Sequence, residues 1–217
     1  MIKRRLLYVI FICFGCAGSD CPERINMLPM YGHIKKCTKQ LDSDNRFLRA
    51  CDKQFKDRQE GAKFYVDRGW GYFYRNHFDT AMMSFNQAWL LDSLNADIYW
   101  GFGNIIGMRD KKFKESLVYF EKSLKLNPDN PRVWESASTS YGQLFFETKD
   151  IDLLNKSIEY LKTSIELDPN NARTYGQLTS AYSYFTQKDS ARKYLQITDK
   201  LDTKAVNPEV REILRKD

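Results

Sequence analysis

Histidine is scarce in this sequence: only His33 and His77 occur among 217 residues. Neither has a neighbouring histidine, cysteine or carboxylate at the spacing that metal sites use. The sequence also lacks a G-x-S-x-G nucleophile motif, an H-E-x-x-H zinc motif and a glycine loop suited to phosphate. We therefore predict a protein that is not an enzyme, with no catalytic residues, no metal and no cofactor.

Charge of one sign is not in large excess. The chain has 34 basic and 28 acidic residues, a formal net charge of +6. Three of the basic residues are Lys3, Arg4 and Arg5, so the chain after residue 15 has 31 basic against 28 acidic side chains. The two signs are interspersed without a basic stripe, so we predict no nucleic-acid partner.

No hydrophobic run is long enough to span a bilayer, which takes about 20 residues. The longest, "LLYVIFICF" at residues 6–14, follows a basic segment, which is typical of a secretory signal peptide over residues 1–15. Gly15-Cys16 resembles the cleavage site of bacterial lipoproteins, which implies a lipid on Cys16. Cleavage after Ser19 is the alternative. We therefore expect an exported protein of the cell envelope, held to a membrane by its lipid without crossing it.

Five cysteines occur, and the signal peptide and the lipid account for Cys13 and Cys16. Cys21, Cys37 and Cys51 remain, so outside a reducing cytosol one pair can form and one thiol is left over. Cys37 with Cys51 is one such pairing. Residues 16–40 show little periodicity, and we expect them to form a tether with some local order.

One short phrase recurs at intervals of 34 to 41 residues: "LDSLN" at 91–95, "LNPDN" at 126–130, "LDPNN" at 167–171 and "LDTKA" at 201–205. Each copy ends a stretch in which apolar residues recur at helical spacing. Pro128 cannot continue a helix because it lacks an N–H, and Asp129 or Asn130 can cap the next one. The phrase therefore predicts a helix end, a tight turn and a helix start.

Within each unit, small and aromatic residues fall at fixed positions. The first unit has them at intervals of 4, 3, 9, 4 and 3, at Tyr65, Gly69, Tyr72, Ala81, Phe85 and Ala88. This pattern resembles the tetratricopeptide repeat (TPR), whose period is 34 residues. The resemblance implies an all-α superhelix of about four helix-turn-helix repeats over residues 62–206, near 62–95, 96–130, 131–171 and 172–205. The third unit has about seven extra residues, which predict a longer first helix and a loop that bulges at residues 149–152.

Repeat arrays need caps over their apolar end faces. An apolar stripe at Phe47, Leu48, Cys51 and Phe55 predicts an N-terminal capping helix over residues 41–60. Val210, Ile213 and Leu214 predict a short C-terminal capping helix within 207–217.

The TPR resemblance also implies a concave groove lined by the first helix of each repeat. Trp, Tyr and Arg contribute much of the binding energy of protein interfaces, and such residues fall at the groove positions together with polar ones. We predict that the partner-binding residues are Trp70, Tyr74, Trp100, Asn104, Arg132, Glu135, Arg173 and Tyr184. The competing interpretation is that Trp70, Phe73 and Trp100 pack under the N-terminal helix. Only Asn104 and Arg132 match the clamp with which some TPR proteins hold a chaperone's terminal carboxylate, so we predict no such clamp.

Two functions fit these residues. The first is a protein-protein interaction scaffold or adaptor that binds a partner protein or peptide in the groove. The alternative is a lipoprotein that binds a glycan or another small ligand by stacking on the aromatic part of the groove.

Overall fold

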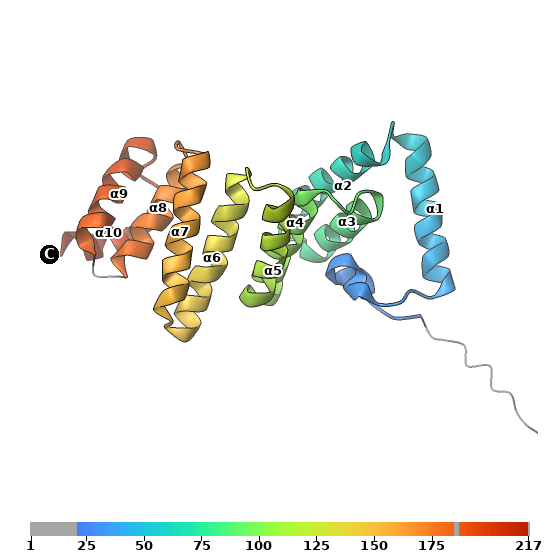
Figure 1. The fold of residues 1–217 in the computed structure, drawn as a ribbon, viewed down its shortest axis with the longest axis horizontal. Coiled ribbons are helices and arrows are strands. Elements are labelled where there is room, and N and C mark those ends of the chain that lie inside the picture. The colour runs from blue at the N-terminus through green and yellow to red at the C-terminus, as the bar shows by residue number, and fades with distance from the viewer. Residues whose placement is uncertain (1–20, 185–186, 217) are drawn as a thin grey trace, which may run out of the picture.

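The computed structural model describes residues 21–184 and 187–216, and in this part of the chain it is an elongated array of helices (Figure 1). The predicted signal peptide and Cys16 lie outside the described residues. None of the helices in the described ranges is both long and apolar enough to cross a membrane.

Two short 3-10 helices precede the α-helices, η1 (Ile25–Met27) and η2 (Pro29–His33). The α-helices of the described chain are α1 (Thr38–Gln54), α2 (Arg58–Phe73), α3 (Phe78–Leu91), α4 (Ala96–Asp110), α5 (Phe113–Leu126), α6 (Pro131–Thr148), α7 (Ile151–Leu167), α8 (Ala172–Ser183), α9 (Lys188–Leu201) and α10 (Pro208–Arg215).

Four helical hairpins follow one another along the array: α2 with α3, α4 with α5, α6 with α7 and α8 with α9. The predicted turn phrase joins each hairpin to the next. The side chains of Asn95, Asn130 and Asn171 each accept a hydrogen bond from a backbone N–H in the first turn of the following helix. The all-α repeat architecture predicted from the sequence is therefore confirmed, and the phrase is the capped start of each new hairpin.

Aromatic rings and glycines interlock between successive hairpins. The Phe85 ring is fully buried, and a Cβ atom placed on Gly69 or Gly101 would come within 3 Å of it. Phe120 packs in the same way against Gly103. The glycines at these positions therefore let α2, α3, α4 and α5 approach closely enough to bury a whole ring.

Serines at the small positions of the repeat also join helices by hydrogen bonds. The Ser116 and Ser140 hydroxyls lie 2.8 Å apart, and those of Ser138 and Ser157 lie 3.0 Å apart. Ser123 donates to the carbonyl of Ala96 over 2.9 Å. These serines therefore do more than fill space, because each buried hydroxyl needs a hydrogen-bond partner and a neighbouring helix supplies it.

The extra residues of the third unit lengthen both of its helices. α6 has 18 residues and α7 has 17, whereas the helices of the first two units have 14 to 16. Only Lys149 and Asp150 lie between α6 and α7, so the prediction of a bulging loop at 149–152 is wrong. Lys149 ends α6 in a left-handed conformation with φ 61°, and the Asp150 carboxylate caps α7, which makes the turn tight.

The prediction of a tether over residues 16–40 is wrong from Cys21 onward. Residues 21–37 form a loop that packs on α3, with Met30 in the core of the first hairpin. The fully buried Asn86 amide donates to the carbonyls of Asn26 and Leu28, over 3.0 and 2.9 Å. Two buried hydrogen bonds and an apolar anchor hold this loop without any sequence periodicity.

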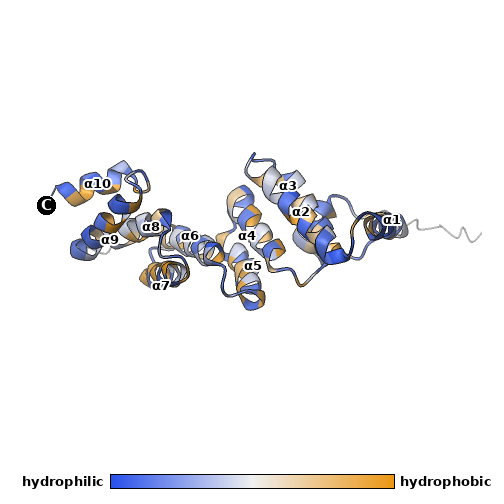
Figure 2. Ribbon diagram, turned by 90° about the horizontal axis from the view of Figure 1, so that it is seen from above, coloured by the Kyte–Doolittle hydropathy of each residue, from blue (hydrophilic) through white to orange (hydrophobic). Residues whose placement is uncertain are grey.

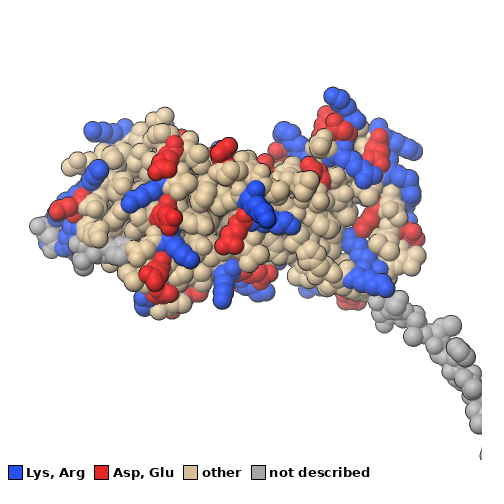
Figure 3. Space-filling view, in the orientation of Figure 1, with Lys and Arg blue, Asp and Glu red and all other residues tan. Residues whose placement is uncertain are grey.

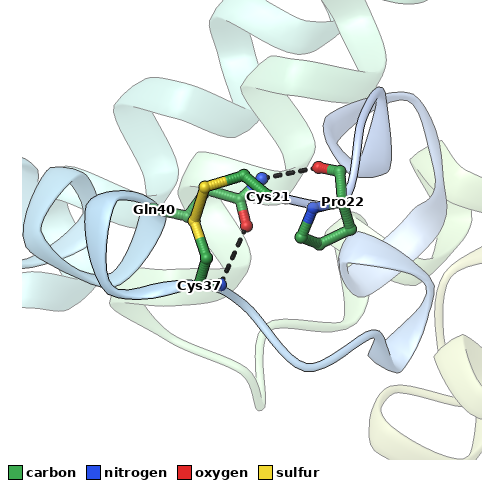
Figure 4. Close-up of a disulfide and its surroundings, with 4 residues drawn as sticks. All are labelled: Cys21, Pro22, Cys37 and Gln40. Atoms are coloured by element: carbon green, nitrogen blue, oxygen red, sulfur yellow. Dashed lines mark hydrogen bonds between the residues drawn. A yellow bond between two sulfur atoms is a disulfide. The ribbon is translucent and has the colours of Figure 1, made fainter. Parts of the chain in front are cut away.

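A disulfide between Cys21 and Cys37 closes the loop, so the pairing of Cys37 with Cys51 is wrong (Figure 4). Cys51 is a buried free thiol on α1, packed against Ala62 and Leu91. Gln40 ties the two ends of the loop together, because its side chain donates to the carbonyl of Pro22 and accepts from the N–H of Cys37 (Figure 4).

Helices cover both ends of the array, at bounds that differ slightly from the expected ones. α1 runs over Thr38–Gln54 where we expected 41–60, and its apolar stripe faces α2 and α3. α10 lies against α8 and α9 at the C-terminal end (Figure 2). Val210 and Leu214 are buried there, whereas Ile213 is 48% exposed and takes no part in the cap.

Candidate functional site

The N-terminal part of the groove has two tryptophans packed against each other. The ring centroids of Trp70 on α2 and Trp100 on α4 lie 4.1 Å apart. Trp100 is only 9% exposed, and its indole N–H donates to the Ser136 hydroxyl on α6 over 2.9 Å. Both rings therefore pack between repeats rather than under the N-terminal helix. Trp100 is nearly closed to solvent, whereas Trp70 stays partly exposed. Tyr74, 68% exposed, is the open ring of this part.

The centre of the groove is polar. The half-buried amide of Asn104 donates to the carbonyl of Trp100 in its own helix over 2.8 Å. Arg132 is exposed at the start of α6 and makes no ion pair within the described residues. Of these two, only Arg132 presents an unpaired charged group to an incoming ligand.

Glu135 on α6 is almost fully buried, with only 6% of its surface exposed. Arg173 on α8 lies 2.7 Å from it, and the Gln177 amide donates to it over 3.3 Å. Burial raises the pKa of Glu135, and the charge of Arg173 opposes this rise. The Gln177 carbonyl oxygen is itself buried without a hydrogen-bond partner in the described structure.

A hollow of about 460 Å³ opens beside this polar group, between α6, α8 and the segment that leads into α10. Hydroxyl, amide and guanidinium groups line it together with two aromatic rings. The ring centroids of Phe146 and Tyr184 lie 5.0 Å apart, and both side chains remain exposed, at 42% and 51%. The polar and aromatic side chains of the lining include Thr139, Gln143, Phe146, Arg173, Gln177 and Tyr184.

The structure therefore brings together Glu135, Arg173 and Tyr184 from the predicted set and separates them from Trp70 and Trp100. It also adds Phe146, which sequence analysis missed. Phe146 lies in the extra length of α6, within the insertion that the repeat alignment had already located. An aromatic residue inside an insertion next to the groove was the available signal for it.

Within residues 21–184 and 187–216 no three histidine, cysteine or carboxylate side chains lie close enough to hold a metal ion. The buried carboxylate of Glu135 is paired with the exposed guanidinium of Arg173 and accepts from the Gln177 amide.

The raised pKa of Glu135 predicts a specific pH dependence of stability. Its folded-state pKa lies above the unfolded value of about 4.3, so the folded state binds the proton more tightly. The free energy of unfolding of the wild type therefore falls as pH rises from about 4.3 through the folded pKa. Glu135→Gln lacks this titration, so the stability of the variant minus that of the wild type should increase over this pH range and then level off.

Urea unfolding of both proteins between about pH 4 and about pH 8 measures this difference. Taking the difference removes the titration of the other carboxylates. A difference that decreases with rising pH would show instead that attraction to Arg173 outweighs the burial of Glu135.

No known family profile matches the sequence, and no curated protein matches it. Solved structures do. MamA is similar at 20% identity, over 85% of this chain and 100% of MamA, with a TM-score of 0.53. TTC0263, a thermophilic TPR protein of Thermus thermophilus, is similar at 16% identity, over 71% of this chain and 80% of its own, with a TM-score of 0.59.

The first TPR domain of Spaghetti (RPAP3), solved with the HSP90 peptide SRMEEVD, is similar at 18% identity, with a TM-score of 0.51. The match covers 59% of this chain and 95% of that domain. At such identities the likeness shows the fold alone. The chain has the TPR superhelical fold, as the repeat pattern predicted.

Proposed function

We propose that this protein is a non-catalytic scaffold or adaptor that binds a partner protein or peptide in its concave groove. The binding centre is the hollow between α6 and α8 rather than the tryptophan pair. The proposal includes the setting expected from the N-terminal sequence: export to the cell envelope and attachment to a membrane through a lipid on Cys16.

The observation that carries the proposal is the make-up of the hollow. The exposed pair of Phe146 and Tyr184 offers apolar area to an anchoring side chain, and interface energy concentrates on such aromatic anchors. Beside them, the exposed Thr139 hydroxyl and the exposed Arg173 guanidinium, which line the same hollow, offer an acceptor and a cation. An extended peptide has both N–H donors and carbonyl acceptors that match such groups. The peptide in the Spaghetti structure supports this use of the fold.

The packing of the tryptophan pair makes the glycan-binding alternative weaker than the peptide-binding proposal. A sugar ring stacks on an open aromatic face. Trp70 and Trp100 lie against each other, and Trp100 is nearly closed to solvent, which leaves Tyr74 as the exposed platform of that part. Phe146 and Tyr184 could still bind a small ligand, and the experiment below separates this outcome.

A photocrosslinking residue in place of Gln143, which is exposed and lines the hollow, should capture the partner in intact cells. Adding Phe146→Ala and Tyr184→Ala should lower the captured amount at least about ten-fold, because truncation of two anchors removes most of the binding energy. The matched control is Leu94→Ala, since Leu94 is 74% exposed in a turn.

Unchanged capture by the folded double variant would contradict the proposal. Stabilisation of the wild type by oligosaccharides but by no captured protein, with the stabilisation lost in the same variant, would favour the small-ligand function instead.

A further inference from the structure

The disulfide-closed loop and α1 form a surface that the groove proposal does not use. Arg24 of the loop and Lys39 and Arg46 of α1 surround an open hollow of about 920 Å³ beside the disulfide. The hollow contains one acidic side chain, Glu23. None of these three basic side chains has an ion-pair partner within the described residues. The lining of the hollow therefore has three basic side chains against one acidic one.

The positions of these cations follow from two independent elements. Lys39 and Arg46 lie seven residues apart on α1, two helical turns, so they share one face of that helix. Arg24 reaches the same hollow because the disulfide and Gln40 hold the start of the loop against the first turns of α1. Figure 3 shows many basic side chains, with acidic ones among them, at this end of the molecule, where the described chain begins.

The tip of the same loop exposes two aliphatic side chains next to each other. Leu28 and Ile34 are 41% and 42% exposed. A Cβ atom on Gly32 would lie 2.8 Å from the Leu28 Cδ1 atom and 3.3 Å from the Ile34 Cδ1 atom, so the two side chains flank one small turn. Gly32 has φ 64°, and Met30, Tyr31 and His33 also have positive φ, which folds the tip back sharply. Exposed apolar residues and an exposed cation, Arg24, thus occur on one short loop, and both kinds of side chain suit the boundary between lipid headgroups and acyl chains.

The sequence before the loop brings this surface near a membrane. Cys21 lies at the rim of the hollow, five positions after Cys16, the predicted lipidation site. Five extended residues span at most about 17 Å. A chain attached to a membrane at Cys16 must therefore keep the loop within reach of the lipid headgroups.

We propose that the Cys21–Cys37 loop and the adjoining face of α1 bind an anionic lipid surface, with Arg24, Lys39 and Arg46 on the headgroup phosphates and Leu28 and Ile34 at the interface. This inference rests on the proposed membrane attachment and is independent of the groove. It assigns the loop the task of orienting the array on the membrane, so that the groove is presented in a defined direction.

Full-length protein reconstituted into vesicles tests the proposal by amide hydrogen exchange of residues 22–40. The vesicles are phosphatidylcholine alone or phosphatidylcholine with about 30% phosphatidylglycerol, which supplies the anionic charge. We expect exchange in this segment to slow by about five-fold or more on the anionic vesicles, since each cation near such a surface contributes roughly five-fold in affinity. About 1 M salt should erase the difference by screening.

The variant Arg24→Glu/Lys39→Glu/Arg46→Glu should show no difference between the two vesicles. The control variant Lys114→Glu/Lys125→Glu/Lys200→Glu makes the same change in net charge at exposed lysines of other repeats and should behave as wild type. Flotation of the vesicles reports attachment separately, so loss of attachment and loss of loop contact are distinct results.

Equal exchange of wild type on neutral and anionic vesicles overturns the proposal, as does a triple variant that keeps the difference. Slowed exchange on neutral vesicles after addition of inorganic phosphate would assign the hollow to free phosphate and also overturn it.

Discussion

Reduction of the Cys21–Cys37 disulfide should lower the free energy of opening of residues 22–54 by about 3 kcal/mol. The bond closes a loop between residues 16 apart, and release of a loop of this size returns about that much chain entropy to the open state. The buried Ile25 and Met30 and the hydrogen bonds from Asn86 and Arg109 still hold the loop after reduction, but they do not replace the lost constraint on the open chain. Hydrogen exchange with and without reductant measures the effect.

Cys51→Ala serves as the control for this prediction. Cys51 is buried and free, so the variant keeps the disulfide and should lose the same stability on reduction as the wild type. If reductant leaves residues 22–54 equally protected, the loop does not depend on the bond. A Cys51→Ala variant that no longer responds to reductant would show that the pairing involves Cys51 after all.

Gly101→Ala should lower the free energy of unfolding by about 2 kcal/mol although alanine favours helices. The added Cβ atom would lie 2.4 Å from the Phe85 Cζ atom. The ring cannot retreat, because it is fully buried and also packed against Gly69. Overpacking of this kind costs about 3 kcal/mol, and the gain in helix propensity returns about 1 kcal/mol. Urea unfolding followed by circular dichroism measures the difference.

Gly71→Ala is the matched control, because Gly71 lies on the exposed side of α2, away from the Phe85 contact at Gly69. The nearest atom to its new Cβ would be the Arg75 Nη2 atom at 3.8 Å, so only the propensity gain of about 1 kcal/mol should remain. Equal effects of the two substitutions, of either sign, would show that the Phe85 ring has room to move and that the helices approach less closely than described.

The repeat architecture could be predicted because its signals are local. Pro128 and Asn130 end one helix and begin the next whatever surrounds them, and small residues at fixed intervals mark where helices touch. The loop over residues 21–37 could not be predicted, because its structure depends on Asn86, some sixty residues away in the sequence. No sequence pattern near residue 26 indicates that the carbonyl of Asn26 accepts a hydrogen bond from the buried amide of Asn86.

Part of the candidate site follows from the sequence for a related reason. Glu135, Arg173 and Tyr184 lie near one another because they occupy repeat positions that face the groove, and their role in binding stays a prediction. Trp70 and Trp100 occupy such positions too, yet the approach of α2 to α4 turns their rings onto each other. Whether a large side chain at a groove position meets solvent or a neighbour depends on the distance between repeats, which the positions alone do not contain.

The sequence by itself determined the number of helical hairpins, the turns between them and the faces that pack, because helix ends and apolar periodicity act over a few residues. Only the tertiary structure decided which cysteines pair, that residues 21–37 are folded and where the groove stays open. These features join residues distant in the chain, and their energies depend on the burial and distances that the packed array creates.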